Sequence, residues 1–161
     1  MKRTWLTSLA LLLAGCGIQP SGVTNAGQAP TGLAPGVTLY FVDAHNHLQP
    51  QIRKTGRLAT ISAAVSLLLT GPGLDDSALH TEIAPVPDGI PPGTVTTAPG
   101  LIQLAVPFTS QDVTPVGIDQ IICTALAAYV QAGGPKSTKV QLIFTLSTPQ
   151  SGKLRTCPVI S

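Results

Sequence analysis

The chain has 161 residues, of which 10% are charged and 4% are aromatic, and its formal net charge is +2. Lys2 and Arg3 are two of its nine basic residues, so the rest of the chain carries seven basic and seven acidic side chains. Nucleic-acid binding needs a dense basic surface with stacking aromatic side chains, and adsorption to an anionic membrane needs a polybasic face. The composition excludes both classes of protein.

The first sixteen residues have the order of a bacterial export signal. Lys2 and Arg3 form a positively charged start, and residues 5–13 form a mostly apolar stretch that is too short to span a bilayer. The motif Leu13-Ala14-Gly15-Cys16 follows, and it resembles the lipobox of bacterial lipoproteins. The resemblance implies transfer of a diacylglycerol to the Cys16 sulfur and cleavage before Cys16. A plain signal peptide with an incidental cysteine and a buried core helix are the alternatives.

The residues after Cys16 predict how the protein is placed. Residues 17–35 contain almost no large apolar side chain, which indicates a flexible tether with a root-mean-square span of roughly 25 Å. We therefore expect a signal peptide at 1–15, a lipidated tether at 16–35 and a folded domain at 36–161. The expected location is the outer face of the bacterial cytoplasmic membrane, where two acyl chains give stable anchoring.

The first half of the domain is predicted to form two strands and a helix. Residues 37–42 are β-branched and aromatic, which favours a strand, and residues 49–54 are a second candidate. Residues 61–69 carry apolar side chains at the spacing of one helical face. Thr60 is the expected N-cap of this helix, and Gly71-Pro72-Gly73 is its expected stop.

The second half is predicted to add a hairpin, a longer helix and two further strands. Residues 94–97 and 101–106 flank the turn signal Pro99-Gly100. A helix is expected to begin at Thr114-Pro115 and to end at Gly133-Gly134-Pro135, and the last strands are expected at 139–146 and 154–159. Each helix has a single apolar stripe. The predicted class is therefore α+β, with two helices packed on one face of a mixed or antiparallel sheet.

Four segments of the domain carry a resemblance to a known family. They are VTLYF at 37–41, AVSLLLTGP at 64–72, LHTEI at 79–83 and DQIICT at 119–124. Over roughly residues 37–144 they resemble the GerMN domain, which is named for a spore-germination and sporulation lipoprotein. The chain departs from the family pattern between Ile83 and Gly93, where a longer proline-rich passage replaces a short Ile-Pro turn.

The GerMN resemblance implies a non-catalytic extracytoplasmic domain that assembles with other envelope proteins. Some lipoprotein members of the family partner with a sensor kinase, and the family brings neither catalytic residues nor a cofactor to this chain. The sequence itself contains no G-x-S-x-G nucleophile elbow and no phosphate-binding glycine loop. We therefore do not expect an enzyme.

The segment Asp43-Ala44-His45-Asn46-His47 is the strongest candidate for chemistry in the domain. Residues two apart in a strand share a face, so Asp43, His45 and His47 could bind one metal ion. The segment is also similar to the metal-binding signature that ends the first strand of amidohydrolases, but those enzymes use a barrel of about 250 residues. The reading that we favour is a polar strand end and loop. A small metal-binding lipoprotein or metal-dependent hydrolase is the alternative function.

Cys123 and Cys157 remain once Cys16 is assigned to the lipid. An extracytoplasmic compartment is oxidising, so an even pair of cysteines indicates a disulfide that ties the second helix to the last strand. Two separate buried thiols are the alternative.

The favoured function is a membrane-anchored interaction or assembly module of the cell envelope. Its expected contact surface is a sheet face, an edge strand or the proline-rich residues 85–92, and its expected partner is another envelope protein. Self-association into an assembly scaffold is a further hypothesis.

Overall fold

The computed structural model describes residues 36–56, 59–73, 78–87 and 89–160. The expected signal peptide, Cys16 and the tether lie outside these residues. Within the described ranges, no helix combines the length and the hydrophobicity that crossing a membrane requires.

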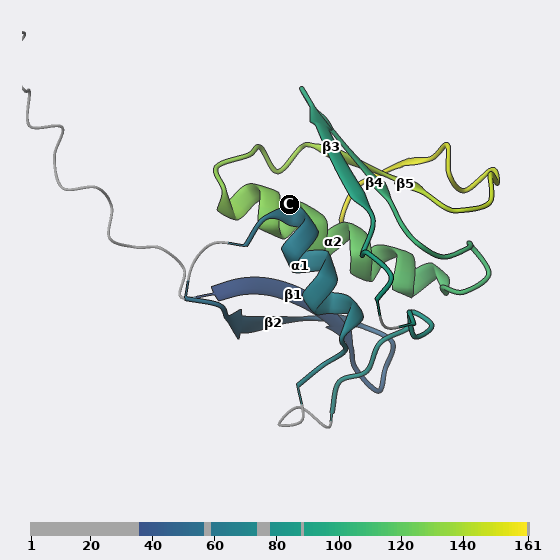
Figure 1. The fold of residues 1–161 in the computed structure, drawn as a ribbon. Coiled ribbons are helices and arrows are strands. Elements are labelled where there is room, and N and C mark those ends of the chain that lie inside the picture. The colour runs from purple at the N-terminus through teal and green to yellow at the C-terminus, as the bar shows by residue number, and fades with distance from the viewer. Residues whose placement is uncertain (1–35, 57–58, 74–77, 88, 161) are drawn as a thin grey trace, which may run out of the picture. The chain divides into compact units, whose positions relative to one another are not determined.

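Pairs of strands alternate with single helices along the described part of the chain (Figure 1). The elements are β1 (Gly36–Val42), β2 (Leu48–Lys54), α1 (Ile61–Leu69), β3 (Thr94–Ala98), β4 (Leu101–Ala105), α2 (Pro115–Gln131), β5 (Lys139–Ile143) and β6 (Leu154–Arg155). Every predicted helix and strand is present, and the predicted α+β class is confirmed.

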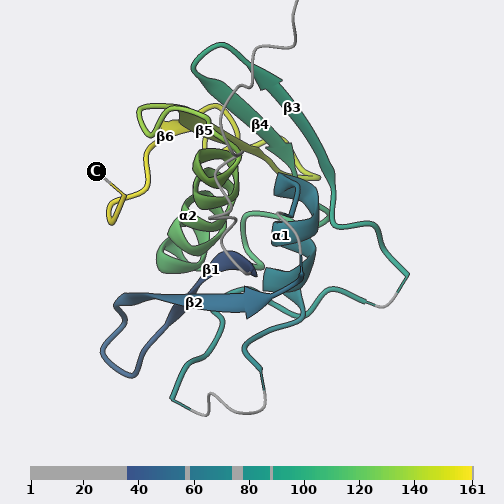
Figure 2. The same ribbon diagram turned by 90° about the vertical axis from the view of Figure 1, so that its left-hand side faces the viewer.

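The strands divide between two sheets. β1 and β2 form an antiparallel hairpin, whereas β3, β4, β5 and β6 form a second sheet in that order, in which β4 and β5 are parallel and the other pairs are antiparallel. Figures 1 and 2 show both helices between the β1–β2 hairpin and the four-stranded sheet. The helices therefore cover one face of the four-stranded sheet, and the opening hairpin covers them from the other side.

The hydrophobic core lies where the helices meet the two sheets. Alternate residues of β4 and β5 face the helices, and β1 presents its own apolar residues from the opposite side. The fully buried side chains include Val37, Leu39, Phe41, Leu68, Ile102, Ile121, Ile122, Leu126 and Val140. Each side chain of this size contributes about 1.5–3 kcal/mol when it leaves water.

Both helices begin at the residues that the sequence predicted. Thr60 caps α1 by accepting a hydrogen bond from the Ala63 N–H at 3.1 Å, and Thr114 caps α2 by accepting one from the Gly117 N–H at 3.1 Å. These bonds satisfy N–H groups that have no partner inside the helix. Gly133, which follows α2, has a φ of 93°, a conformation that glycine adopts without steric cost.

Polar side chains of α2 complete the backbone hydrogen bonding of β1. One edge of β1 pairs with β2. At the other edge, the Tyr40 N–H donates to Thr124 Oγ1 at 3.0 Å, and the Thr38 N–H donates to Gln131 Oε1 at 3.3 Å. A buried N–H without a partner costs about 1–3 kcal/mol, which explains why a buried helix carries polar residues here.

The same arrangement continues beyond the end of β1. Val42 and His80 exchange two backbone hydrogen bonds, at 3.0 and 2.9 Å. The Glu82 N–H then donates to Oε1 of Gln120, a fully buried residue of α2, at 3.0 Å. β1 therefore has partners at both edges, although it belongs to a two-stranded sheet.

Replacing Thr124 by Val keeps the shape of the side chain but leaves the Tyr40 N–H buried without an acceptor. We expect Thr124→Val to lower the free energy of unfolding by about 1–3 kcal/mol in urea denaturation of the full chain. The matched control is Thr138→Val, because the Thr138 side chain is also fully buried and its hydroxyl has no hydrogen-bond partner among the described residues. This control should keep or gain stability, and equal losses in both variants would contradict the role of Thr124.

The disulfide expected from the sequence is present and joins Cys123 of α2 to Cys157, with the two Cα atoms 4.8 Å apart. The last two strands are shorter than predicted, because β5 ends at Ile143 and β6 ends at Arg155. After β5 the chain leaves the sheet, and the Thr145 N–H donates to the Phe108 carbonyl at 3.1 Å. After β6 it turns onto α2, where Cys157 bonds to Cys123.

Removing the disulfide should destabilise the fold. The bond joins residues 34 positions apart. For a loop of that length, the chain-entropy relation gives a loss of about 4 kcal/mol in the free energy of unfolding. We expect that loss for the double variant Cys123→Ala, Cys157→Ala in urea denaturation, and a similar loss for the wild-type chain after reduction. Unchanged stability in both samples would mean that the bond contributes little to the fold.

Candidate functional site

Asp43 organises the loop between β1 and β2. Its Oδ1 accepts hydrogen bonds from the backbone N–H groups of His45 at 2.8 Å and His47 at 3.0 Å, and its Oδ2 accepts one from Gln49 Nε2 at 2.9 Å. Asn46 at the tip has a φ of 62°, in the left-handed region that asparagine tolerates in turns. The Asp43 carboxylate therefore holds a tight turn together.

The two histidines of this loop are not gathered around one point. The ring centroids of His45 and His47 are 6.3 Å apart, and His47 Nδ1 lies 3.9 Å from Asp43 Oδ2. His80 pairs instead with Glu82, with 3.1 Å between Nε2 and Oε1. Among the residues that the structure describes, no three His, Cys, Asp or Glu side chains are grouped so that they could hold a metal ion. Because protein zinc sites use at least three such ligands, the geometry favours the turn over the metal site.

The hydrogen bonds of the turn lower the pKa of the Asp43 carboxyl from 3.8 to about 2, and the backbone N–H of His47 is the largest cause. These bonds favour the charged form of the carboxyl. Because its pKa in the folded state is below its unfolded value, the stabilisation is fully present above pH 3.8 and is lost as the pH falls through about 2.

A titration of the Asp43 carboxyl by nuclear magnetic resonance tests this arrangement. We expect a midpoint near pH 2 in the wild-type chain, and a higher midpoint in Gln49→Leu, which removes the hydrogen bond to Oδ2. A wild-type midpoint at or above the ordinary 3.8 would show that the carboxyl does not hold the turn.

Two clefts border the proline-rich segment. The first has a volume of about 390 Å³ and lies between the end of α1, at Leu69 and Thr70, and the side chains of Val86 and Ile90. The second has a volume of about 250 Å³ and lies between residues 84–87 and the loop that joins β4 to α2. Both clefts are lined mainly by Pro and other apolar residues. The proline-rich residues 85–92, one of the contact surfaces expected from the sequence, therefore border two concave surfaces.

Asp112 is the charged residue on the wall of the second cleft. Its Oδ2 accepts hydrogen bonds from the Thr109 hydroxyl at 2.7 Å and from the Thr109 N–H at 2.8 Å. Both hydrogen bonds lower the pKa of the Asp112 carboxyl, and the bond from the hydroxyl is the larger cause. The Asp112 side chain is therefore an anion at neutral pH. The described residues that line this cleft include no His, Cys or Lys.

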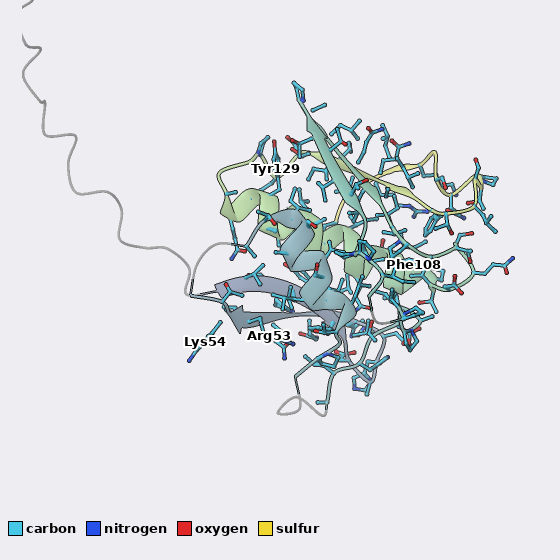
Figure 3. The ribbon with its side chains drawn as sticks, viewed as in Figure 1. Arg53, Lys54, Phe108 and Tyr129 are labelled. Atoms are coloured by element: carbon cyan, nitrogen blue, oxygen red, sulfur yellow. A yellow bond between two sulfur atoms is a disulfide. The ribbon has the colours of Figure 1, made fainter. Side chains whose placement is uncertain are left out.

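Phe108 lines the second cleft and anchors it to the core. Its side chain is 7% exposed, and its ring centroid lies 6.3 Å from that of Phe144, which follows β5. Figure 3 shows Phe108 on the opposite side of the domain from Arg53 and Lys54, which end β2. The cleft is therefore well separated from this basic pair.

The outer face of the four-stranded sheet carries half-buried and exposed side chains and is almost uncharged. It is made of alternate residues of β3, β4 and β5, with Leu154 of β6 beside them. The residues of this face are Thr94, Thr96, Ala98, Leu101, Gln103, Ala105, Lys139, Gln141, Ile143 and Leu154. Lys139 is the only charged residue among these ten. Ile143 is 39% exposed and Leu154 is 58% exposed, so large apolar side chains face solvent here.

The sequence identified the residues of the turn and of the disulfide but not the cleft at Asp112. Asp112 belongs to the cleft only because the loop before α2 lies beside residues 84–87, and the Ala84 N–H donates to the Asp112 carbonyl at 2.8 Å. No spacing within the sequence indicates such a contact. Cys16, the predicted lipid site, lies outside the described residues.

Comparisons of the chain with protein-family models, with curated proteins and with solved structures gave no match. The resemblance to the GerMN domain therefore stays a prediction from the sequence.

Proposed function

We propose that this chain is a bacterial lipoprotein, anchored through Cys16 to the outer face of the cytoplasmic membrane, and that its domain is a non-catalytic interaction module of the cell envelope. The observation that carries the proposal is the Cys123–Cys157 disulfide. Disulfides persist in oxidising compartments and are rare in the cytosol. The bond supports an oxidising location for the domain, which is also what the export signal predicted from the sequence implies.

Exposed apolar surface supports the interaction role. On the outer face of the four-stranded sheet, Ile143 of β5 is 39% exposed and Leu154 of the neighbouring β6 is 58% exposed. Together with the clefts beside the proline-rich segment, whose walls combine apolar and polar side chains, these neighbouring side chains offer contact area to another protein. The GerMN resemblance adds that the partner is an envelope protein, for which a membrane sensor kinase is the family precedent.

The anchor is tested by feeding cells an alkyne-tagged fatty acid and isolating the full-length chain. We expect label on the wild-type chain in the membrane fraction and none on Cys16→Ala, because the thiol that accepts the lipid is gone. The double variant Cys123→Ala, Cys157→Ala is the matched control and should keep the label. Equal labelling of wild type and Cys16→Ala would contradict the lipoprotein assignment.

The same strains test the interaction role by crosslinking in intact cells, followed by mass spectrometry of the joined proteins. A specific envelope protein should be captured by the wild-type chain and not by Cys16→Ala. The proposal would be overturned if the purified chain turned over an envelope substrate, or if anchored and unanchored chains captured the same proteins.

A further inference from the structure

β3 is an open edge of the four-stranded sheet, because the order β3-β4-β5-β6 gives it a neighbour on one side only. The Lys139 N–H donates to the Gly100 carbonyl and the Val106 N–H donates to the Ile143 carbonyl, so even-numbered residues of β4 bond to β5. Odd-numbered residues of β4 therefore bond to β3, and through the register these are opposite Thr94, Thr96 and Ala98. The backbone N–H and C=O groups of Val95 and Thr97 are left at the open edge.

The other strand edges are closed or protected. The free edge of β1 is occupied by α2 side chains and by His80. β2 contains Pro50 and ends in Arg53-Lys54, which lie at the end of that strand in Figure 3. Proline and charged side chains are the devices by which natural sheets prevent the addition of another strand. β6 has two residues and is followed by the disulfide.

β3 has none of these devices. Its sequence is TVTTA, without a proline or a charge, and four of its five residues are exposed. The flanking residues 90–93 and 99–100 are also uncharged. Figures 1 and 2 show the β3–β4 hairpin reaching beyond the helices, and no other described strand lies beside the free edge of β3. An unprotected edge of this kind is a template for strand addition.

We propose that β3 docks onto β3 of a second copy of this chain, in antiparallel register centred on Thr96, so that the two four-stranded sheets become one continuous sheet. This deepens the proposed function, on which it rests, because it makes a second copy the first partner of the anchored domain.

The sequence of β3 suits self-pairing. In the symmetric register Thr96 lies opposite its own copy, Thr94 lies opposite Ala98, and Val95 lies opposite Thr97. No pair brings like charges together, and the central pair joins two threonines, which stabilise antiparallel strands. A charged edge would repel its own copy across the twofold axis, whereas this one does not.

The proposed contact is small, so we expect it to form only when the chains are anchored to a membrane. Five residues form the strand, far fewer than the roughly 20–30 residues a side of a stable interface. Pairing should therefore be weak between chains that are free in solution. Anchoring through Cys16 would confine the copies to one surface and raise their effective concentration.

Cysteine crosslinking in the full-length, membrane-anchored chain tests the register. In the proposed dimer Thr96 faces its copy as a non-hydrogen-bonded pair, with the two Cα atoms about 4.5 Å apart. This is within disulfide range, so Thr96→Cys should form a covalent dimer under mild oxidation. Thr94→Cys is the matched control, because Thr94 is equally exposed and on the same face but would lie about 14 Å from its copy. The pair Thr94→Cys, Ala98→Cys should restore the crosslink.

Thr97→Pro provides the second arm. This substitution removes an N–H at the open edge of β3 without removing a hydrogen bond to β4. Combined with Thr96→Cys, it should abolish the crosslinked dimer. The Cys123–Cys157 bond should still form, which shows that the domain folds. No crosslink at residue 96, or equal crosslinking at 94 and 96, would overturn the β3 dimer.

The labelling and capture experiments separate this outcome from the parent proposal. Failure of the Thr96→Cys crosslink in a chain that is acylated and captures an envelope protein would overturn only the dimer. A crosslinked dimer in a chain without acylation would overturn the lipoprotein anchor and the dependence of pairing on the membrane, but not the β3 dimer itself.

Discussion

A strand with one sheet neighbour must find other partners for the N–H groups of its second edge, and in this domain the buried helix α2 supplies them. Thr124 and Gln131 accept from β1, and Gln120 accepts from the segment that continues its edge. An apolar helix in this position would leave these donors buried without acceptors, at about 1–3 kcal/mol each. The two sheets can therefore cover opposite sides of the helices without being joined to each other.

The same helix fixes where the rest of the chain can go. Cys157 is bonded to Cys123 of α2, so the chain after β6 must return to the helix, and β6 stays short. Burial raises the pKa of the Asp119 carboxyl on α2, and the positive charge of Arg155 on β6 opposes that shift. With β1 closed by α2 and β2 protected by its own residues, the longest unprotected edge in the described part of the chain is β3. Its place in the proposed dimer thus follows from how the other edges are closed.

Local patterns in the sequence predicted each element, because apolar periodicity, threonine caps and glycine stops act over a few residues. The disulfide was also predictable, from the oxidising compartment that the predicted export signal implies. The separation into two sheets was not predictable, because it depends on side chains of α2 bonding to a strand that is distant in the sequence; Tyr40 and Thr124 are 84 residues apart. The spacing of the carboxylate and the imidazoles in the Asp43 segment is compatible with a metal site, which is the alternative to a polar strand end and loop. In three dimensions the carboxylate is occupied by backbone N–H groups of the turn.

Hydrogen exchange resolved to single backbone amides, on the anchored chain and on a Cys16→Ser chain, tests the account most directly. We expect the Tyr40 amide to be strongly protected from exchange in both chains, because its N–H is hydrogen-bonded to Thr124 Oγ1. We also expect the Val95 and Thr97 amides to exchange quickly in the Cys16→Ser chain and slowly in the anchored one, where a second β3 closes the edge. Fast exchange at Tyr40, or equal exchange at Val95 and Thr97 in the two chains, would contradict the account.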